Sequence, residues 1–160
     1  MDHLWSPWRY QYVTTAGRDG ACIFCEKSAA RNDAGNFVVY RGKRNFVLLN
    51  IFPYTTGHLM IAPYEHVATL EETAEETVSE MALLARLAEK QLRAVYRPQG
   101  INVGMNIGEC AGAGVAGHIH MHVLPRWVGD SSFMTTVGET RVLPEAVNVT
   151  YEKLSRAFGA

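Results

Sequence analysis

The chain of 160 residues is 48% hydrophobic, which is enough for one compact domain (1–160) with a core of its own. Its net charge of −1 argues against a nucleic-acid-binding surface or an anionic-membrane binder, because both need a basic surplus. No apolar run approaches the roughly 18 residues of a bilayer span, and the N-terminus lacks the pattern of a secretory signal. We therefore expect a cytoplasmic protein without a membrane segment.

The first 36 residues predict an irregular, aromatic-rich arm that ends in a Cys-x-x-Cys knuckle at Cys22 and Cys25. Three cysteines make an odd count, and two of them lie in this pair. That usage suits a reducing compartment and a metal or redox site better than a disulfide framework. Buried thiols and a redox pair remain alternatives to a metal site, and we assign no role to Cys110.

Segments 37–40, 46–49 and 59–62 predict strands separated by turn residues. A long helix follows, with capping boxes that begin at Thr69 or at Thr73 as two possible starts. Apolar residues then recur at helical spacing from Val78 to Val95, and Pro98 ends the helix. The glutamates of its first turns indicate a solvated helix start, without a catalytic role.

Beyond this helix, segments 101–106 and 118–124 predict two more strands joined by a glycine-rich turn at 108–117. A short edge strand is expected at 141–143 and a C-terminal helix at 144–158. The order predicts an α+β domain with a mainly antiparallel sheet, one long helix and a C-terminal helix.

Half of the six histidines alternate in the strand expected at 118–124. Successive side chains of a strand point to opposite faces, so His118, His120 and His122 should share one face. The apolar residues between them should share the other and pack on the core. The pattern favours a chemical site carried by a buried strand.

Two kinds of chemistry fit these histidines. In the first, all three bind a catalytic Zn²⁺, although only Glu109 and Asp130 lie near enough in sequence to orient them. Cys22 and Cys25 would then be a separate ligand pair, which His66 and a strand histidine could complete. In the second, the middle imidazole attacks phosphorus, while its neighbours and backbone N–H groups of the glycine-rich turn bind the phosphate oxygens.

The run His118-Ile119-His120-Met121-His122-Val123-Leu124 resembles the His-φ-His-φ-His-φ-φ signature of the histidine triad (HIT) superfamily. The similarity extends over most of the chain. Its further motifs are Cys22-Ile23-Phe24-Cys25, Asn50 before Pro53, Gly57-His58, 63–66, 102–108 and Pro125-Arg126. The opening Leu4-Trp5-Ser6-Pro7-Trp8-Arg9 and the later Trp127, Gly129-Asp130 and Phe133 are similar to the branch that contains bacterial diadenosine tetraphosphate (Ap4A) phosphorylases and hydrolases. The resemblance implies a HIT-like fold.

The resemblance also implies a role for each site residue. His120 would be the nucleophile, His122 would contact the α-phosphate, His118 would support the geometry, and His58 would lie in the network behind them. The implied substrate-binding residues are Asn50 for the ribose, Ile51, Phe52 and Pro53 for the base, and Asn106 with Gly112, Ala113 and Gly114 along the phosphates. The plainer alternative for Asn50 is a turn residue. For Trp5, Trp8 and Trp127 we expect a role in packing and not in base stacking.

In zinc-bearing relatives the metal ligands match Cys22, Cys25, His66 and His118, a closed structural set that would attach the arm to the histidine strand. His66 as a helix cap is the alternative. Relatives are commonly symmetric dimers, so we expect a homodimer. Gly114 departs from the Gln, Ser or Thr that many relatives carry there, and it leaves the leaving group and the acceptor open.

The leading hypothesis is a nucleotidyl hydrolase or transferase that cleaves dinucleoside polyphosphates such as Ap4A through a nucleotidyl-histidine on His120, with release to water or phosphate. The alternatives are a nucleoside phosphoramidate or adenylate hydrolase and a nucleotide-binding module with vestigial activity.

Overall fold

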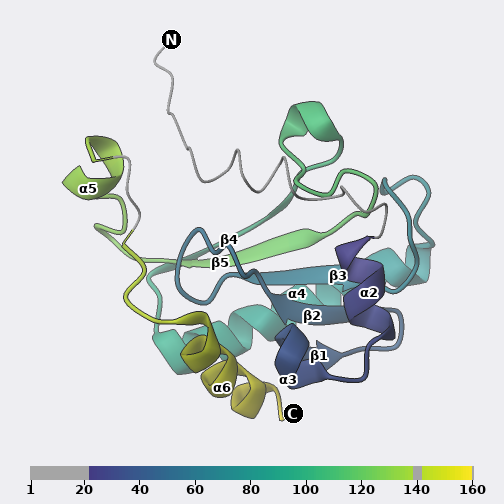
Figure 1. The fold of residues 1–160 in the computed structure, drawn as a ribbon, viewed down its shortest axis with the longest axis horizontal. Coiled ribbons are helices and arrows are strands. Elements are labelled where there is room, and N and C mark those ends of the chain that lie inside the picture. Colours follow the sequence, from purple (N-terminus) through teal and green to yellow (C-terminus); the bar gives the residue numbers. More distant parts are fainter. Residues whose placement is uncertain (1–21, 139–141, 160) are drawn as a thin grey trace.

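A computed structural model of the chain describes residues 22–138 and 142–159, whose centre is a five-stranded antiparallel sheet (Figure 1). The strand order is β1-β2-β3-β5-β4, so the strand that contains the last triad histidine lies one position from the edge. The strands are β1 (Val38–Arg41), β2 (Asn45–Leu49), β3 (Leu59–Pro63), β4 (Gly100–Met105) and β5 (Met121–Arg126). All four neighbouring pairs are antiparallel.

The sheet separates two apolar clusters. On one face, helices α4 (Glu75–Tyr96) and α6 (Val147–Phe158) pack side chains such as Met81 and Leu154 against Ile61 and Val123 (Figure 1). The cluster of the other face contains Phe24, Val38, Phe46, Leu48 and Ala62. Strand β2 is buried on both faces for this reason. None of the helices in the described ranges has the length and apolar character needed to cross a bilayer.

The predicted α+β class is confirmed, and the first strands lie within one residue of their predicted ends. The prediction of an irregular arm is wrong for the part of it that the structure describes. Residues 22–36 contain two short helices, α2 (Ile23–Ala29) and α3 (Asp33–Asn36), and residues 1–21 of the predicted arm lie outside the described residues. Helices of seven and four residues are too short to show a period, and tertiary contacts must hold them.

The long helix begins at Glu75 with Ala74 as its N-cap and no side-chain cap, so neither predicted capping box, at Thr69 or at Thr73, starts it. Thr69 instead closes a turn: its hydroxyl accepts a hydrogen bond from the Glu72 amide at 3.4 Å, and its carbonyl accepts one from the Thr73 hydroxyl at 2.7 Å. The same side-chain chemistry that caps helices also stabilises such turns.

The strand predicted at 118–124 also begins later than expected, because β5 starts at Met121 and leaves His118 and His120 in the preceding segment. The β3–β5 register pairs Ile61 with Met121, so two residues further along the strand Pro63 would lie opposite Ile119. Proline has no N–H to donate, and the ladder ends there. The Ile119 amide donates to the Val67 carbonyl instead, at 2.7 Å.

At the C-terminal end, α6 begins at Val147, three residues after the predicted start. Glu145 holds the chain before the helix, because its carboxylate accepts hydrogen bonds from the Tyr96 and Thr150 hydroxyls at 2.5 and 2.8 Å and pairs with Lys153. Of the predicted edge strand 141–143, Arg141 lies outside the described residues, and Val142 and Leu143 form no strand.

Gly57 has a backbone that only glycine adopts without strain. Its φ is +80°, and an added Cβ would lie 3.2 Å from side-chain atoms of Leu92, Tyr96 and Pro125. Gly57 therefore lets the β2–β3 loop turn against α4 immediately before His58.

We expect Gly57→Ala to lower the free energy of unfolding by about 1–3 kcal/mol, because left-handed backbone strain and crowding add. Gly159→Ala is the matched control, since Gly159 also has a φ of +80° but an added Cβ there meets nothing within 4 Å. The difference between the two variants in urea denaturation measures the crowding, and equal losses would contradict it.

Candidate active site and metal cluster

The four predicted metal ligands come together in the structure. The nearest ligand atoms of Cys22, Cys25, His66 and His118 all lie within 4.8 Å of one another. The Nδ1 atom of His118 is 3.3 Å from Cys22 Sγ and 3.6 Å from Cys25 Sγ, and His66 Nδ1 is 3.3 Å from Cys25 Sγ. Two ligands thus come from the start of α2 and two from the segments that follow β3 and precede β5.

These distances suit a tetrahedral zinc ion. Bonds of about 2.3 Å to sulfur and about 2.0 Å to nitrogen at tetrahedral angles separate a sulfur and a nitrogen ligand by roughly 3.6 Å. His118 Nε2–H donates to the Pro63 carbonyl at 3.0 Å, so Nδ1 carries the lone pair that faces the sulfurs. A Cys₂His₂ set with an oriented histidine fits a closed structural site. Because His118 faces the cysteines, it does not join His120 and His122 in a three-histidine catalytic site.

A hydrogen-bonded chain links His122 to the β2–β3 loop. His58 Nδ1 lies 3.2 Å from the Tyr54 amide, which can only donate, and it also accepts from the Asn50 side-chain NH₂ at 3.3 Å. The proton of His58 is therefore on Nε2, which donates to His122 Nδ1 at 2.8 Å. It follows that neutral His122 carries its own proton on Nε2.

His120 has the opposite tautomer. Its Nδ1–H donates to the His118 carbonyl at 2.9 Å, so the lone pair is on Nε2. The ring is only 4% exposed and lies between the Phe24 ring (centroids 4.8 Å apart) and the His122 ring (4.9 Å). The two adjacent imidazoles thus offer a lone pair on one Nε2 and an N–H on the other.

All three triad histidines are held neutral. Burial lowers the pKa of His118 and His120, although the backbone carbonyl that each one contacts acts in the opposite direction. Burial and the neighbouring His120 lower the pKa of His122 to about 4. Neutral imidazole is the form that can attack phosphorus, so the protonation state of these rings near pH 7 is compatible with nucleophilic chemistry.

The predicted base-binding loop lies beside this network. Asn50 Oδ1 accepts from the Phe52 amide at 2.9 Å, which is the turn role considered for it, while its NH₂ group contacts His58. Ile51 and Phe52 are neighbours in the chain and are 39% and 45% exposed. Pro53 is half-buried. The loop thus offers apolar surface next to the histidines.

The glycine-rich turn folds on itself before His118. The Asn106 side chain donates to the Gly112 carbonyl at 3.4 Å, and the Ala113 amide donates to the Gly108 carbonyl at 3.3 Å. Gly112 ends a short 3₁₀ helix (Glu109–Ala111) with a φ of +88°, and Gly114 follows as a half-buried residue. The side-chain amide of Asn106 therefore closes the loop that leads into the triad.

A cavity of about 590 Å³ lies at the carboxyl end of β5, away from His120. Its lining includes Tyr54, Tyr96, Leu124, Arg126, Trp127 and Lys153. Trp127 packs edge-on against Tyr96 with ring centroids 6.5 Å apart, in keeping with the predicted packing role. Tyr54 connects this cavity to the site, since its ring lies 4.7 Å from His58 and 6.0 Å from His122.

Comparison with known proteins decides the family. The HIT domain model matches residues 31–128. The chain belongs to the HIT family. It is 36% identical to an AP-4-A phosphorylase of Mycobacterium tuberculosis, over 97% of this chain and 83% of that protein.

Two solved HIT structures agree with the fold. A Zn-bound histidine triad family protein from Mycobacterium smegmatis has a TM-score of 0.71 and 30% identity, covering 88% of this chain and 94% of that one. A HIT family member from Bacillus subtilis has a TM-score of 0.60 and 31% identity, covering 66% and 73%. The predicted family is confirmed, and the chain is a HIT-family enzyme of the nucleotide hydrolase and transferase class.

Two residues of the HIT site escaped the sequence analysis. Phe24 packs on both His118 and His120, with ring centroids 5.1 and 4.8 Å away, and its position inside the Cys-x-x-Cys motif was the only signal. Tyr54 sets the His58 tautomer through its backbone amide, for which no side-chain pattern exists.

The low pKa of His122 predicts a loss of stability in acid. An unfolded imidazole titrates near 6.5, so between that value and about 4 the unfolded chain binds a proton here that the folded protein does not. The free energy of unfolding therefore falls as the pH drops through this window, by on the order of 3 kcal/mol from His122 alone.

Replacing His122 with Asn removes this contribution. Urea denaturation at several pH values should show a shallower pH dependence for His122→Asn than for the wild type. His118 and His120 remain in both proteins and cancel in the comparison. Parallel curves would show that His122 is not the group that titrates.

Proposed function

We propose that this protein transfers a nucleotidyl group from a dinucleoside polyphosphate such as Ap4A to inorganic phosphate, through a covalent nucleotidyl intermediate on His120. The observation that carries the proposal is the complementary pair of buried, neutral imidazoles, with a lone pair on His120 Nε2 and an N–H on His122 Nε2. Similarity to an enzyme named AP-4-A phosphorylase supports this substrate class.

In the first step, His120 Nε2 attacks the α-phosphorus of Ap4A. A P–N bond forms, the bond to the bridging oxygen breaks, and ATP leaves with that oxygen and its electron pair. His122 Nε2–H donates to an α-phosphate oxygen as its negative charge grows, a contact that matters most in the transition state. The His120 Nδ1–H bond to the His118 carbonyl stabilises the positive charge that the attacking ring acquires.

In the second step, phosphate attacks the same phosphorus, the P–N bond breaks, and ADP leaves while His120 regains its lone pair. Water in place of phosphate would release AMP. Similarity to an enzyme named AP-4-A phosphorylase supports phosphate as the acceptor.

The substrate would lie along the loops that flank the histidines. We assign the ribose to Asn50, the base to the slot of Ile51, Phe52 and Pro53, and the polyphosphate to Asn106 and the backbone N–H groups of Gly112, Ala113 and Gly114. The exposed apolar surface of Ile51 and Phe52 supports the base position. His58 acts as a positioning residue, since it holds the His122 tautomer.

We assign zinc to Cys22, Cys25, His66 and His118 as a structural ion. When bound, it would attach α2 to the segment before His120 without an open position for substrate. The distances within the cluster and the similarity to a Zn-bound family member support this assignment. The homodimer and the cytoplasmic location expected from the sequence remain predictions.

Product analysis tests the proposed reaction. Incubation with Ap4A should give ATP and ADP with phosphate present, whereas ATP and AMP in both conditions would identify a hydrolase.

His120→Asn should lower the rate by about 10³-fold or more, because it removes the nucleophile, while AMP binding stays close to that of the wild type. Undiminished turnover by this variant would refute the covalent route. Faster cleavage of an adenosine phosphoramidate than of Ap4A would favour the other substrate class.

Metal analysis tests the structural ion. We expect about one zinc per chain, lost in Cys22→Ser and retained in His120→Asn. A matched control is Cys110→Ser, which removes a cysteine outside the cluster. Loss of zinc in His120→Asn and retention in Cys22→Ser would instead indicate a metal held by the triad.

A further inference from the structure

Helix α2 supplies two of the four proposed metal ligands, and contacts with the rest of the fold must fix its position. Cys22 is its N-cap and Cys25 lies in its first turn, but the helix has only seven residues. A helix of this length is unstable in isolation and depends on tertiary contacts. Its apolar attachment is Phe24, which is 2% exposed. Its polar attachment is at the other end.

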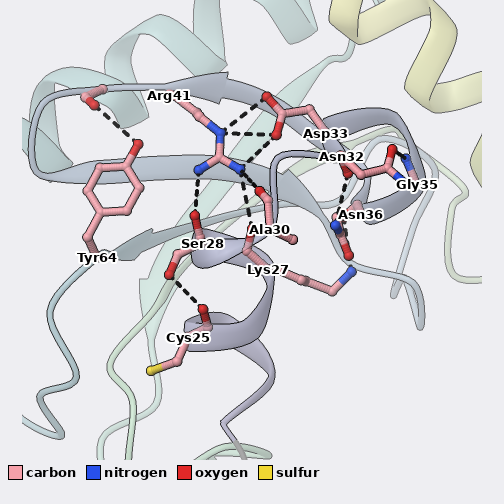
Figure 2. Close-up of polar contacts among 11 residues, drawn as sticks. Cys25, Lys27, Ser28, Ala30, Asn32, Asp33, Gly35, Asn36, Arg41 and Tyr64 are labelled. Atoms are coloured by element: carbon pink, nitrogen blue, oxygen red, sulfur yellow. Dashed lines mark hydrogen bonds and ion pairs between the residues drawn. The ribbon is translucent and has the colours of Figure 1, made fainter.

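That polar attachment is Arg41, the last residue of β1 (Figure 2). Its guanidinium donates to three backbone carbonyls at the end of α2: Ser28 from Nη1 at 2.9 Å, and Ala30 and Lys27 from Nη2 at 2.8 and 3.3 Å. The last carbonyls of a helix have no partner within it, and a cation there also complements the helix dipole. Arg41 thus caps α2 from the sheet.

Asp33 orients the guanidinium from the opposite side. Its Oδ1 accepts from Arg41 Nη2 at 2.7 Å and its Oδ2 accepts from Nε at 3.2 Å, a two-point pairing that holds the fork in one plane. The network continues toward the cluster, because the Ser28 hydroxyl donates to the Cys25 carbonyl at 2.8 Å (Figure 2). One arginine therefore connects β1, α3 and the helix that carries both cysteines.

This connection bears on metal binding through geometry. His118 is held on the sheet by its hydrogen bond to the Pro63 carbonyl. The two cysteines lie at the start of α2, so their position relative to the sheet depends on α2. The distance between the sulfur and nitrogen ligands is therefore set by how α2 is held. A ligand set kept in place before the metal arrives loses less conformational entropy on binding.

We propose that Arg41, oriented by Asp33, is a positioning residue that sets the metal affinity of the Cys22, Cys25, His66 and His118 cluster, although it touches no metal. The inference rests on the structural metal site proposed above. Residues that orient ligands from outside the coordination sphere commonly change metal affinity by 10–100-fold.

The test is zinc affinity, measured by competition with a chromogenic chelator, for Arg41→Gln, Arg41→Lys and Asp33→Asn in the full chain. We expect Arg41→Gln to bind zinc at least about tenfold more weakly than the wild type. Arg41→Lys should be nearly as weak, because one ammonium cannot span three carbonyls and a carboxylate. Asp33→Asn should fall between, since the carbonyl contacts remain.

Arg126→Gln is the matched control. Arg126 also makes a two-point pair, with Asp130 at 2.5 and 2.8 Å, and a bond to Asn102, but it lies at the end of β5. The zinc affinity of Arg126→Gln should stay within about twofold of that of the wild type. At saturating Co²⁺, all variants should show the visible spectrum of the same tetrahedral Cys₂His₂ set, because no ligand has changed.

Unchanged zinc affinity in Arg41→Gln, or equal losses in Arg41→Gln and Arg126→Gln, would overturn the inference and leave the metal site intact. A wild type that binds no zinc would refute the metal site itself. If Arg41→Gln does not fold by circular dichroism, Asp33→Asn decides, and wild-type affinity in that variant would overturn the role of the pair.

Discussion

The missing N–H of Pro63 is the constraint on which the site depends. Because it ends the β3–β5 ladder opposite Ile119, only His122 of the triad lies in a regular strand. The Pro63 carbonyl is then available to His118 Nε2–H, and this bond turns Nδ1 toward the cysteine sulfurs. A strand continued to residue 118 would place the three histidines at alternate positions of one ladder. Here only His122 has a strand position, and His118 faces the cysteines.

His120 lies where two independent supports meet. The metal cluster and Phe24 hold it on the α2 side, whereas His122, His58 and the Tyr54 amide form a directional chain on the other. The cysteine and histidine cluster would support His120 through coordination bonds when a metal is bound, whereas the chain through His122 supports it through the direction of its hydrogen bonds. An imidazole between them is oriented from both sides, which is what an attack on phosphorus along one line requires.

The sequence was informative where side chains carry the signal. Side-chain patterns between turn residues predicted the strands, and helical spacing predicted α4. The His-φ-His-φ-His run and the Cys-x-x-Cys pair carried the family resemblance, and that resemblance implied the four residues that come together as ligands. It failed where backbone groups act. The amide of Tyr54, the carbonyl of Pro63 and the caps on α2 have no side-chain pattern, and they depend on a register that only the folded sheet defines. Helices α2 and α3 were missed for the same reason, because Arg41 stabilises them from a different element.

The way the tautomers are set explains why the site can stay neutral. A carboxylate beside His58 or His120 would orient the ring equally well, but it would raise the imidazole pKa and favour the protonated form, which has no lone pair for attack. Backbone amides and carbonyls orient the rings without adding a charge. His120 is oriented in this way by the His118 carbonyl, and His122 by the N–H of the His58 ring. Burial therefore outweighs the raising effect of the carbonyl on the pKa of His120, and the oriented ring keeps the lone pair that the proposed attack needs.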